Sequence, residues 1–183
     1  MRAYENEPIV VQRDVRAVVI PAGVEVKLRT GQAGYITQSL GGSFTVYVEG
    51  NLFRIAGEDA DAIGKESARP PELPPNATDE DLKKIVWDQM RSCYDPEIPI
   101  NIVDLGLVYE CEVKPAEGGA RDVEIKMTLT APGCGMGEVL VQDVKEKVER
   151  VPTVREARVE LVFDPPWDQS MMSEAARLQT GMM

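Results

Sequence analysis

Histidine is absent from the 183-residue sequence, and cysteine is scarce. Without imidazole, the chain cannot run Ser-His-Asp or Cys-His catalysis or build an HExxH metal site. The three cysteines, Cys93, Cys111 and Cys134, form no CxxC pair. This excludes a zinc ribbon and a thioredoxin-type motif, and an odd, sparse set also argues against a disulfide framework.

Basic charge and long apolar runs are lacking as well. The chain carries 20 Lys and Arg against 31 Asp and Glu, a net charge of −11, which argues against nucleic acid as a partner. No apolar run is long enough to span a bilayer, and the first ten residues do not have the order of a signal peptide. We therefore expect a soluble, cytoplasmic protein without membrane contact.

Proline marks a boundary in the chain, because four prolines fall within residues 70–75. Such a stretch favours extended geometry and cannot continue a helix or a central strand. Residues 1–66 carry 7 basic and 9 acidic groups, whereas residues 67–183 carry 13 and 22. We predict a domain at 1–66, a linker at 67–77 and a more acidic domain at 78–183.

The first domain is rich in short β signals separated by Gly, Asn and Pro. The pairs Gly41-Gly42 and Gly50-Asn51 can adopt the positive φ that two-residue hairpin turns require. Six short strands at this spacing predict a small closed β barrel.

The second domain begins with a capping box, Thr78 to Asp81, followed by apolar residues at helical spacing that include Cys93. Two alternating segments, 107–113 and 123–129, predict an antiparallel hairpin that points Cys111 into the core. A second helix and a third strand follow. The predicted fold is therefore α+β: the barrel, then an α-β-β-α-β domain that ends in a short C-terminal helix near Ser170 or Ser173, which we expect to cover a sheet edge or face.

Cys134 differs from the other cysteines because it stands in APGCGMG, between a predicted strand and a predicted helix. A helix N-terminus lowers the pKa of a nearby thiol, and the flanking glycines leave room for approach. The thiolate is then a nucleophile or a soft metal ligand. A buried small residue in a tight turn explains the same pattern equally well.

Carboxylates and hydroxyls occur near this cysteine in the predicted fold. The loop DPEIPINIVDLG supplies Asp95, Glu97 and Asp104, and the second strand of the hairpin ends at Thr128 and Thr130. Because the loop leads into the first strand of that hairpin, it can meet Cys134 at one rim of the sheet. Caps and solvated loop charges are the commoner use of such carboxylates.

Three motifs in order carry a family resemblance: DPEIPINIVDLGLVY, MTLTAPGCGMG and FDPPWDQSMMSEAARLQ. Over about residues 78–179 they resemble the SufT and PaaD-like iron-sulfur cluster assembly factors, and the β domain in front resembles the SufT branch. The motif positions fall on Asp95, Glu97, Asp104, Thr128, Thr130 and Cys134. Proline often follows the motif cysteine in the wider group, whereas this chain has Gly135, which is compatible with the SufT branch.

The resemblance implies a non-enzymatic factor in the maturation of iron-sulfur proteins. It implies Cys134 as the reactive thiol or metal ligand, and no firmly bound cofactor. One cysteine cannot hold a cluster that needs about four ligands, so an iron-sulfur cluster or iron would be bound transiently and shared with a partner. The implied partners are iron-sulfur assembly and carrier proteins and client apoproteins, and self-association into a homo-oligomer stays open.

Two other functions stay open from the residues alone. A thiol enzyme could use Cys134 with a carboxylate such as Asp104 or Glu97, although a carboxylate is a poor base unless burial raises its pKa. A non-catalytic adaptor could use its acidic surface to dock a basic partner, with Cys134 serving only in packing.

Overall fold

A computed structural model describes residues 6–95, 98–133 and 135–181. The chain forms two compact units, Met1–Pro70 and Pro71–Met183. Among the residues described, no helix is long and apolar enough to cross a membrane. The predicted domain limits of 66 and 78 stay a prediction.

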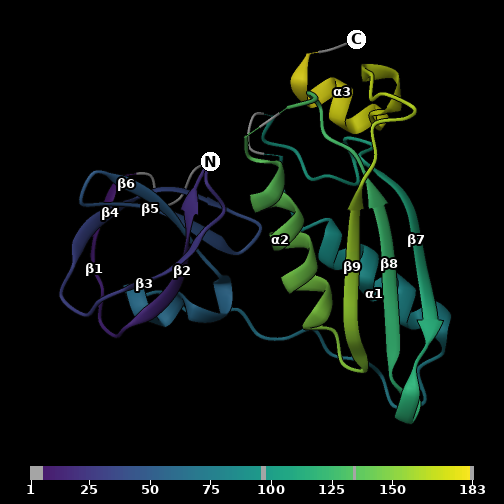
Figure 1. Cartoon of the computed structure of the whole chain (residues 1–183), viewed down its shortest axis with the longest axis horizontal. Helices are drawn as coiled ribbons and strands as arrows, with labels where there is room; N and C mark the ends of the chain where they lie inside the picture. Colours follow the sequence, from purple (N-terminus) through teal and green to yellow (C-terminus); the bar gives the residue numbers. More distant parts are fainter. Residues whose placement is uncertain (1–5, 96–97, 134, 182–183) are drawn as a thin grey trace. The chain divides into compact units, whose positions relative to one another are not determined.

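The N-terminal unit is built on a single six-stranded antiparallel sheet (Figure 1). Its strand order is β1-β4-β5-β6-β2-β3. The strands are β1 (Glu7–Val10), β2 (Val15–Ile20), β3 (Glu25–Leu28), β4 (Ala33–Leu40), β5 (Ser43–Val48) and β6 (Asn51–Ile55). A 3-10 helix, η1 (Gly57–Ile63), follows the last strand. One face of the sheet supplies the core, in which Ile36, Val46 and Ile55 are fully buried.

The predicted closure of this sheet into a barrel is wrong. Among the described strands, β1 and β3 stand at the two ends of the order, and each is paired on one side. Both are only four residues long. Pro8 in β1 has no N–H to donate, and proline within sheets is confined to edges and bulges. The short end strands therefore leave an open sheet.

The two predicted hairpin turns have different outcomes. Gly41 and Gly42 form the β4–β5 turn with φ of 62° and 81°, as predicted. The β5–β6 turn is one residue earlier than predicted, because Val48 pairs with Asn51 and the turn residues are Glu49 and Gly50. Both have positive φ, 47° and 88°, which a two-residue hairpin turn needs.

The C-terminal unit has the predicted α-β-β-α-β order with a short final helix. Its elements are α1 (Asp79–Met90), β7 (Val108–Pro115), β8 (Arg121–Met127), α2 (Gly137–Glu149), β9 (Val154–Leu161) and α3 (Glu174–Thr180), with 3-10 turns η2 (Glu117–Gly119) and η3 (Gln169–Met171). β7 and β8 form the predicted antiparallel hairpin, whereas β9 lies parallel to β8. Parallel strands need a long crossover, which α2 provides.

Capping residues start the first and last helices of this unit as predicted. The Thr78 side chain accepts from the Asp81 N–H, and the Asp81 side chain accepts from the Thr78 N–H, which completes the capping box. Ser173 caps α3 by accepting from the Ala176 N–H. These bonds satisfy donors that a helix leaves free in its first turn.

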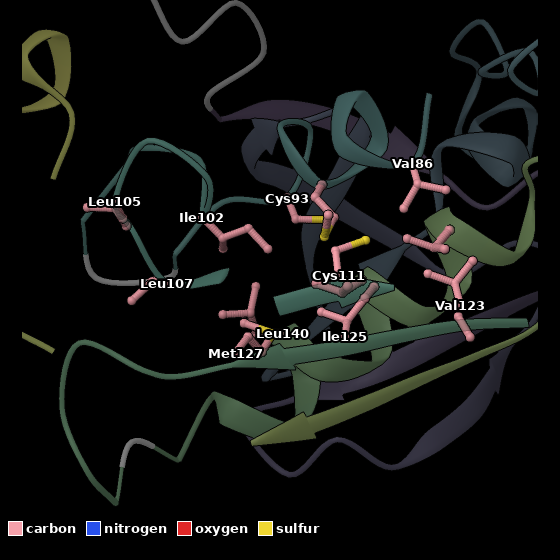
Figure 2. Close-up of a cluster of buried hydrophobic side chains, with 14 of the residues drawn as sticks. Val86, Cys93, Ile102, Leu105, Leu107, Cys111, Val123, Ile125, Met127 and Leu140 are labelled. Atoms are coloured by element: carbon pink, nitrogen blue, oxygen red, sulfur yellow. The ribbon is translucent and has the colours of Figure 1, made fainter. Parts of the chain in front are cut away.

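The core of the C-terminal unit lies between the two long helices and one face of the sheet. Figure 2 shows Val86 from α1 and Leu140 from α2 in a cluster with Val123, Ile125 and Met127 from β8. These five side chains are at most 3% exposed. The opposite face of the sheet carries charged residues, so the alternation predicted for the hairpin is confirmed.

Candidate functional site

The segment between α1 and β7 carries the first of the predicted site residues. The Ile102 N–H donates to the Cys93 carbonyl, and Tyr94 pairs with Asn101, so the segment folds back on itself. Asp95 is only 3% exposed, and its Oδ1 accepts from the Ile98 N–H at 2.9 Å. This carboxylate is used in holding its own loop. Glu97 lies outside the described residues.

Asp104 belongs to a tight turn, residues 101–106, which we call the motif turn. Its Oδ2 accepts from Asn101 Nδ2 at 2.7 Å, and its backbone N–H donates to Asn101 Oδ1 at 2.9 Å. The turn is closed by the Leu105 N–H, which donates to the Asn101 carbonyl, and the Gly106 N–H, which donates to the Val103 carbonyl. Asp104 is half-buried, and its carboxylate is held in one place by Asn101.

Thr128 joins the motif turn to the end of β8. Its backbone N–H donates to the Leu107 carbonyl at 2.8 Å, and the residue is 1% exposed. Thr130, two residues further on, is half-buried. The segment with Asp104 and the segment that leads toward residue 134 are thus hydrogen-bonded neighbours at one end of the sheet.

Cys134 itself lies outside the described residues, but the glycines on both sides of it are described. A Cβ built on Gly133 or Gly135 would meet no heavy atom within 4 Å. The predicted helix begins close by, since α2 starts at Gly137. There, a Cβ would stand 2.8 Å from Leu129 Cδ1, so glycine lets the helix start pack on that side chain. The predicted thiolate character of Cys134 stays a prediction.

The other two cysteines are buried, as predicted. Cys93 is fully buried and Cys111 is 6% exposed, and Figure 2 shows both in the apolar cluster. Burial raises the pKa of the Cys111 thiol to about 11, so it stays protonated at neutral pH. In the parts of the chain that are described, no group of three or more Cys, Asp or Glu residues is placed to hold a metal ion. Cys93 and Cys111 therefore serve packing.

The sequence prediction did not foresee that the C-terminal segment contacts the motif turn. Trp167 Nε1 donates to the Leu105 carbonyl at 2.7 Å, and the Ser173 N–H donates to the Asp104 carbonyl at 2.8 Å. Figure 1 shows α3 beyond the ends at which the arrows of β8 and β9 finish. The only available signal was that Trp167 and Asp104 both stand in the motifs that carry the resemblance.

Comparisons with known proteins agree on one family. Residues 83–161 match the family described as iron-sulfur cluster assembly protein. The chain is 42% identical over 106 residues to an Fe-S protein maturation auxiliary factor of Porphyromonas gingivalis, a match that covers 58% of this chain and 93% of that protein.

Two further relatives carry similar names. The Fe-S protein maturation auxiliary factor YitW of Bacillus subtilis is 35% identical, over 57% of this chain and 98% of its own. The factor SufT of Staphylococcus aureus is 40% identical, over 48% of this chain and 96% of its own. The resemblance to the SufT group is thereby confirmed, and the chain belongs to the iron-sulfur cluster assembly family of Fe-S protein maturation auxiliary factors.

Proposed function

We propose that this chain is an accessory factor in the maturation of iron-sulfur proteins, with Cys134 as its reactive thiol and transient ligand for iron or a cluster. The observation that carries the proposal is the meeting of motif segments at one end of the C-terminal sheet. The Leu107 carbonyl, next to the motif turn, accepts from the Thr128 N–H, and the chain then runs to the open glycines 133 and 135. Gly133 and Gly135 are both exposed, which supports approach of a second protein to this part of the chain.

Transient, shared ligation follows from the ligand count. A cluster needs about four ligands, and this chain brings one motif cysteine, Cys134, to the proposed site. The remaining ligands would come from a client apoprotein, an assembly or carrier protein, a second copy of this chain or a small thiol. A cluster held by a single protein thiol is also easily passed on, as a delivery role requires.

Location in the cytoplasm stays a prediction.

Accessory action fits the residues better than thiol catalysis. The chain has no histidine, and its described motif carboxylates are already used as acceptors: Asp95 accepts from Ile98 and Asp104 from Asn101. Without imidazole, the base for the thiol would have to be a carboxylate, whose ordinary pKa lies far below that of a thiol. The acceptor roles of these carboxylates hold the backbone in place, which suits a docking and transfer surface.

The test is genetic complementation. In cells that lack this protein, the activity of a [4Fe-4S] dehydratase is measured after rescue with wild type, Cys134→Ser or Cys111→Ala. Cys111→Ala is the matched control, because it removes a buried thiol outside the motifs. We expect wild type and Cys111→Ala to restore activity and Cys134→Ser to fail while still folded. Equal rescue by Cys134→Ser would contradict the proposed role of the thiol and leave an adaptor.

A further inference from the structure

The last residues of the motif turn have their backbone carbonyls satisfied from outside the turn. A backbone C=O group that finds no partner within its own turn needs one elsewhere when it is shielded from water. Here the Asp104 carbonyl accepts from the Ser173 N–H, and the Leu105 carbonyl accepts from the Trp167 indole. We call residues 164–180 the C-terminal strap. It supplies both donors, the backbone N–H of Ser173 and the indole N–H of Trp167.

Gly106 brings the strap into direct contact with the turn. Its φ is +75°, and a Cβ at this position would stand 2.2 Å from the Met171 carbonyl oxygen. No side chain fits in that space, so the backbone of the strap lies against the backbone of the turn. The approach explains why this position is glycine, independently of its φ.

The strap is itself fixed to the C-terminal unit by packing and by a third hydrogen bond. Met172 and Ala176 are 3% and 2% exposed and belong to the apolar core. The Tyr109 hydroxyl, at the start of β7, donates to the Pro165 carbonyl at 2.8 Å. The strap can therefore transmit the rigidity of the core to the turn.

We propose that the C-terminal strap is a positioning element for Asp104, and that Trp167 and Tyr109 are its positioning residues. The strap holds the backbone of the motif turn from one side, while Asn101 holds the Asp104 carboxylate from the other. Asp104 thus keeps one orientation relative to Thr128 and the segment that follows it. The proposal rests on the proposed function, because that function is what makes the orientation of Asp104 matter.

The test compares local hydrogen exchange with maturation activity in the full-length chain. Trp167→Phe keeps an aromatic ring packed against the core but removes the donor to the Leu105 carbonyl. We expect the amides of residues 104–107 to exchange about tenfold faster, as the loss of one partly buried hydrogen bond implies. Amides of β8, residues 121–127, serve as the internal reference, and their exchange rates should change less than about twofold. General destabilisation would instead accelerate exchange in both segments equally. Dehydratase rescue should fall several-fold.

Two variants complete the experiment. Trp87→Phe is the matched control, because Trp87 is the other tryptophan packed against the same core and lies on α1, away from the motif turn in sequence. It should leave the exchange rates of residues 104–107 and of β8 unchanged, and it should rescue dehydratase activity like the wild type. Tyr109→Phe removes the hydroxyl that donates to the Pro165 carbonyl. It should also accelerate exchange in residues 104–107 more than in β8, and it replaces Trp167→Phe as the test variant if that protein does not fold.

Two results would overturn the positioning role. Equal acceleration in residues 104–107 and in β8 would mean that the strap only adds stability. Selective loosening with full rescue would mean that the orientation of Asp104 has no consequence. Neither of these results depends on Cys134. Full rescue by Cys134→Ser would contradict the proposed role of the thiol, but it would leave the hydrogen-exchange result for the strap unchanged.

Discussion

The two sheets of this protein bury similar apolar faces but present different outer faces. On the N-terminal sheet, an outward row of cross-strand neighbours is apolar. The row consists of Pro8, Tyr35, Tyr47, Leu52 and Ile20. The Tyr35 and Tyr47 rings stack with their centroids 5.2 Å apart. The exposed fraction of the surface is 38% for Tyr35 and 36% for Tyr47.

On the C-terminal sheet, the outer face is covered by ion pairs. Lys126 pairs with Glu110 at 3.1 Å across β8 and β7, and Lys114 pairs with Glu124 at 2.6 Å. Across β8 and β9, Arg158 Nη1 lies 3.7 Å from Glu124 Oε1. Ring stacking works through contact area and resists salt, whereas exposed ion pairs are screened by it. The outer face of the C-terminal sheet is thus stabilised mainly by ion pairs. The N-terminal sheet has stacked tyrosines and an exposed cross-strand pair, Arg16 with Glu25 at 3.4 Å.

The largest effect should come from the C-terminal unit, at the close contact between Gly106 and the strap. Gly106→Ala combines a disfavoured φ with a clash on the Met171 carbonyl, and it should cost about 3 kcal/mol of unfolding free energy. Gly119→Ala is the matched control, since φ is +77° and no atom lies within 4 Å of its Cβ. It should cost about 1 kcal/mol, from the positive φ alone. Urea unfolding followed by tryptophan fluorescence measures both, because both tryptophans lie in this unit. Equal costs would contradict the clash.

A second, smaller effect concerns the buried face of the C-terminal sheet at high pH. Burial raises the pKa of Cys111 to about 11 from 9.0, so the unfolded chain loses this proton first. The stability that this group contributes is complete below pH 9 and falls as pH rises toward 11, by at most about 1.4 kcal/mol per pH unit. Cys111→Ala should flatten the decline in unfolding free energy between pH 9 and 11. An identical decline in the variant would show that other groups cause it.

On the outer face of the N-terminal sheet, Tyr47→Ala should remove the stacked pair. We expect a loss of about 1 kcal/mol, measured as faster hydrogen exchange in residues 33–55. Tyr47→Phe keeps the ring and is the control, so it should exchange like the wild type. The effect should be the same at low and high salt. A strong salt dependence would mean that stacking is not the force involved.

The smallest effect should come from the outer face of the C-terminal sheet. Lys126→Ala breaks the exposed pair with Glu110, and it should cost about 0.5 kcal/mol or less. The loss should vanish at 1 M salt, where the screening length is about 3 Å. Urea unfolding at two salt concentrations measures it. A larger, salt-independent loss would place Lys126 in packing and remove the contrast between the two sheets.

Local rules were enough to predict much of the C-terminal unit. The capping box at Thr78 and Asp81 depends on residues three apart, so it can be seen in the sequence. Alternation in β8 predicts which side chains are buried, because successive residues point to opposite faces. The same reasoning placed Cys111 in the core. In the N-terminal unit it found the strands and missed one turn by a residue.

The candidate site was only partly predictable. Asp95, Asp104 and Thr128 were identified from motifs, and the structure shows that each is held by a specific hydrogen bond. The roles of Trp167 and Gly106 could not be read from spacing. Both act on partners more than 60 residues away in the chain, and no local period encodes such a contact.

The sequence by itself determined the elements, their caps, their buried faces and the lack of an imidazole mechanism. Each of these depends on residue type and on neighbours within one or two turns. The tertiary structure alone decided that the N-terminal sheet stays open and that the strap donates hydrogen bonds to the motif turn. Those outcomes depend on which distant backbone donors and acceptors come within hydrogen-bond distance, and only the packing of the whole unit determines that distance.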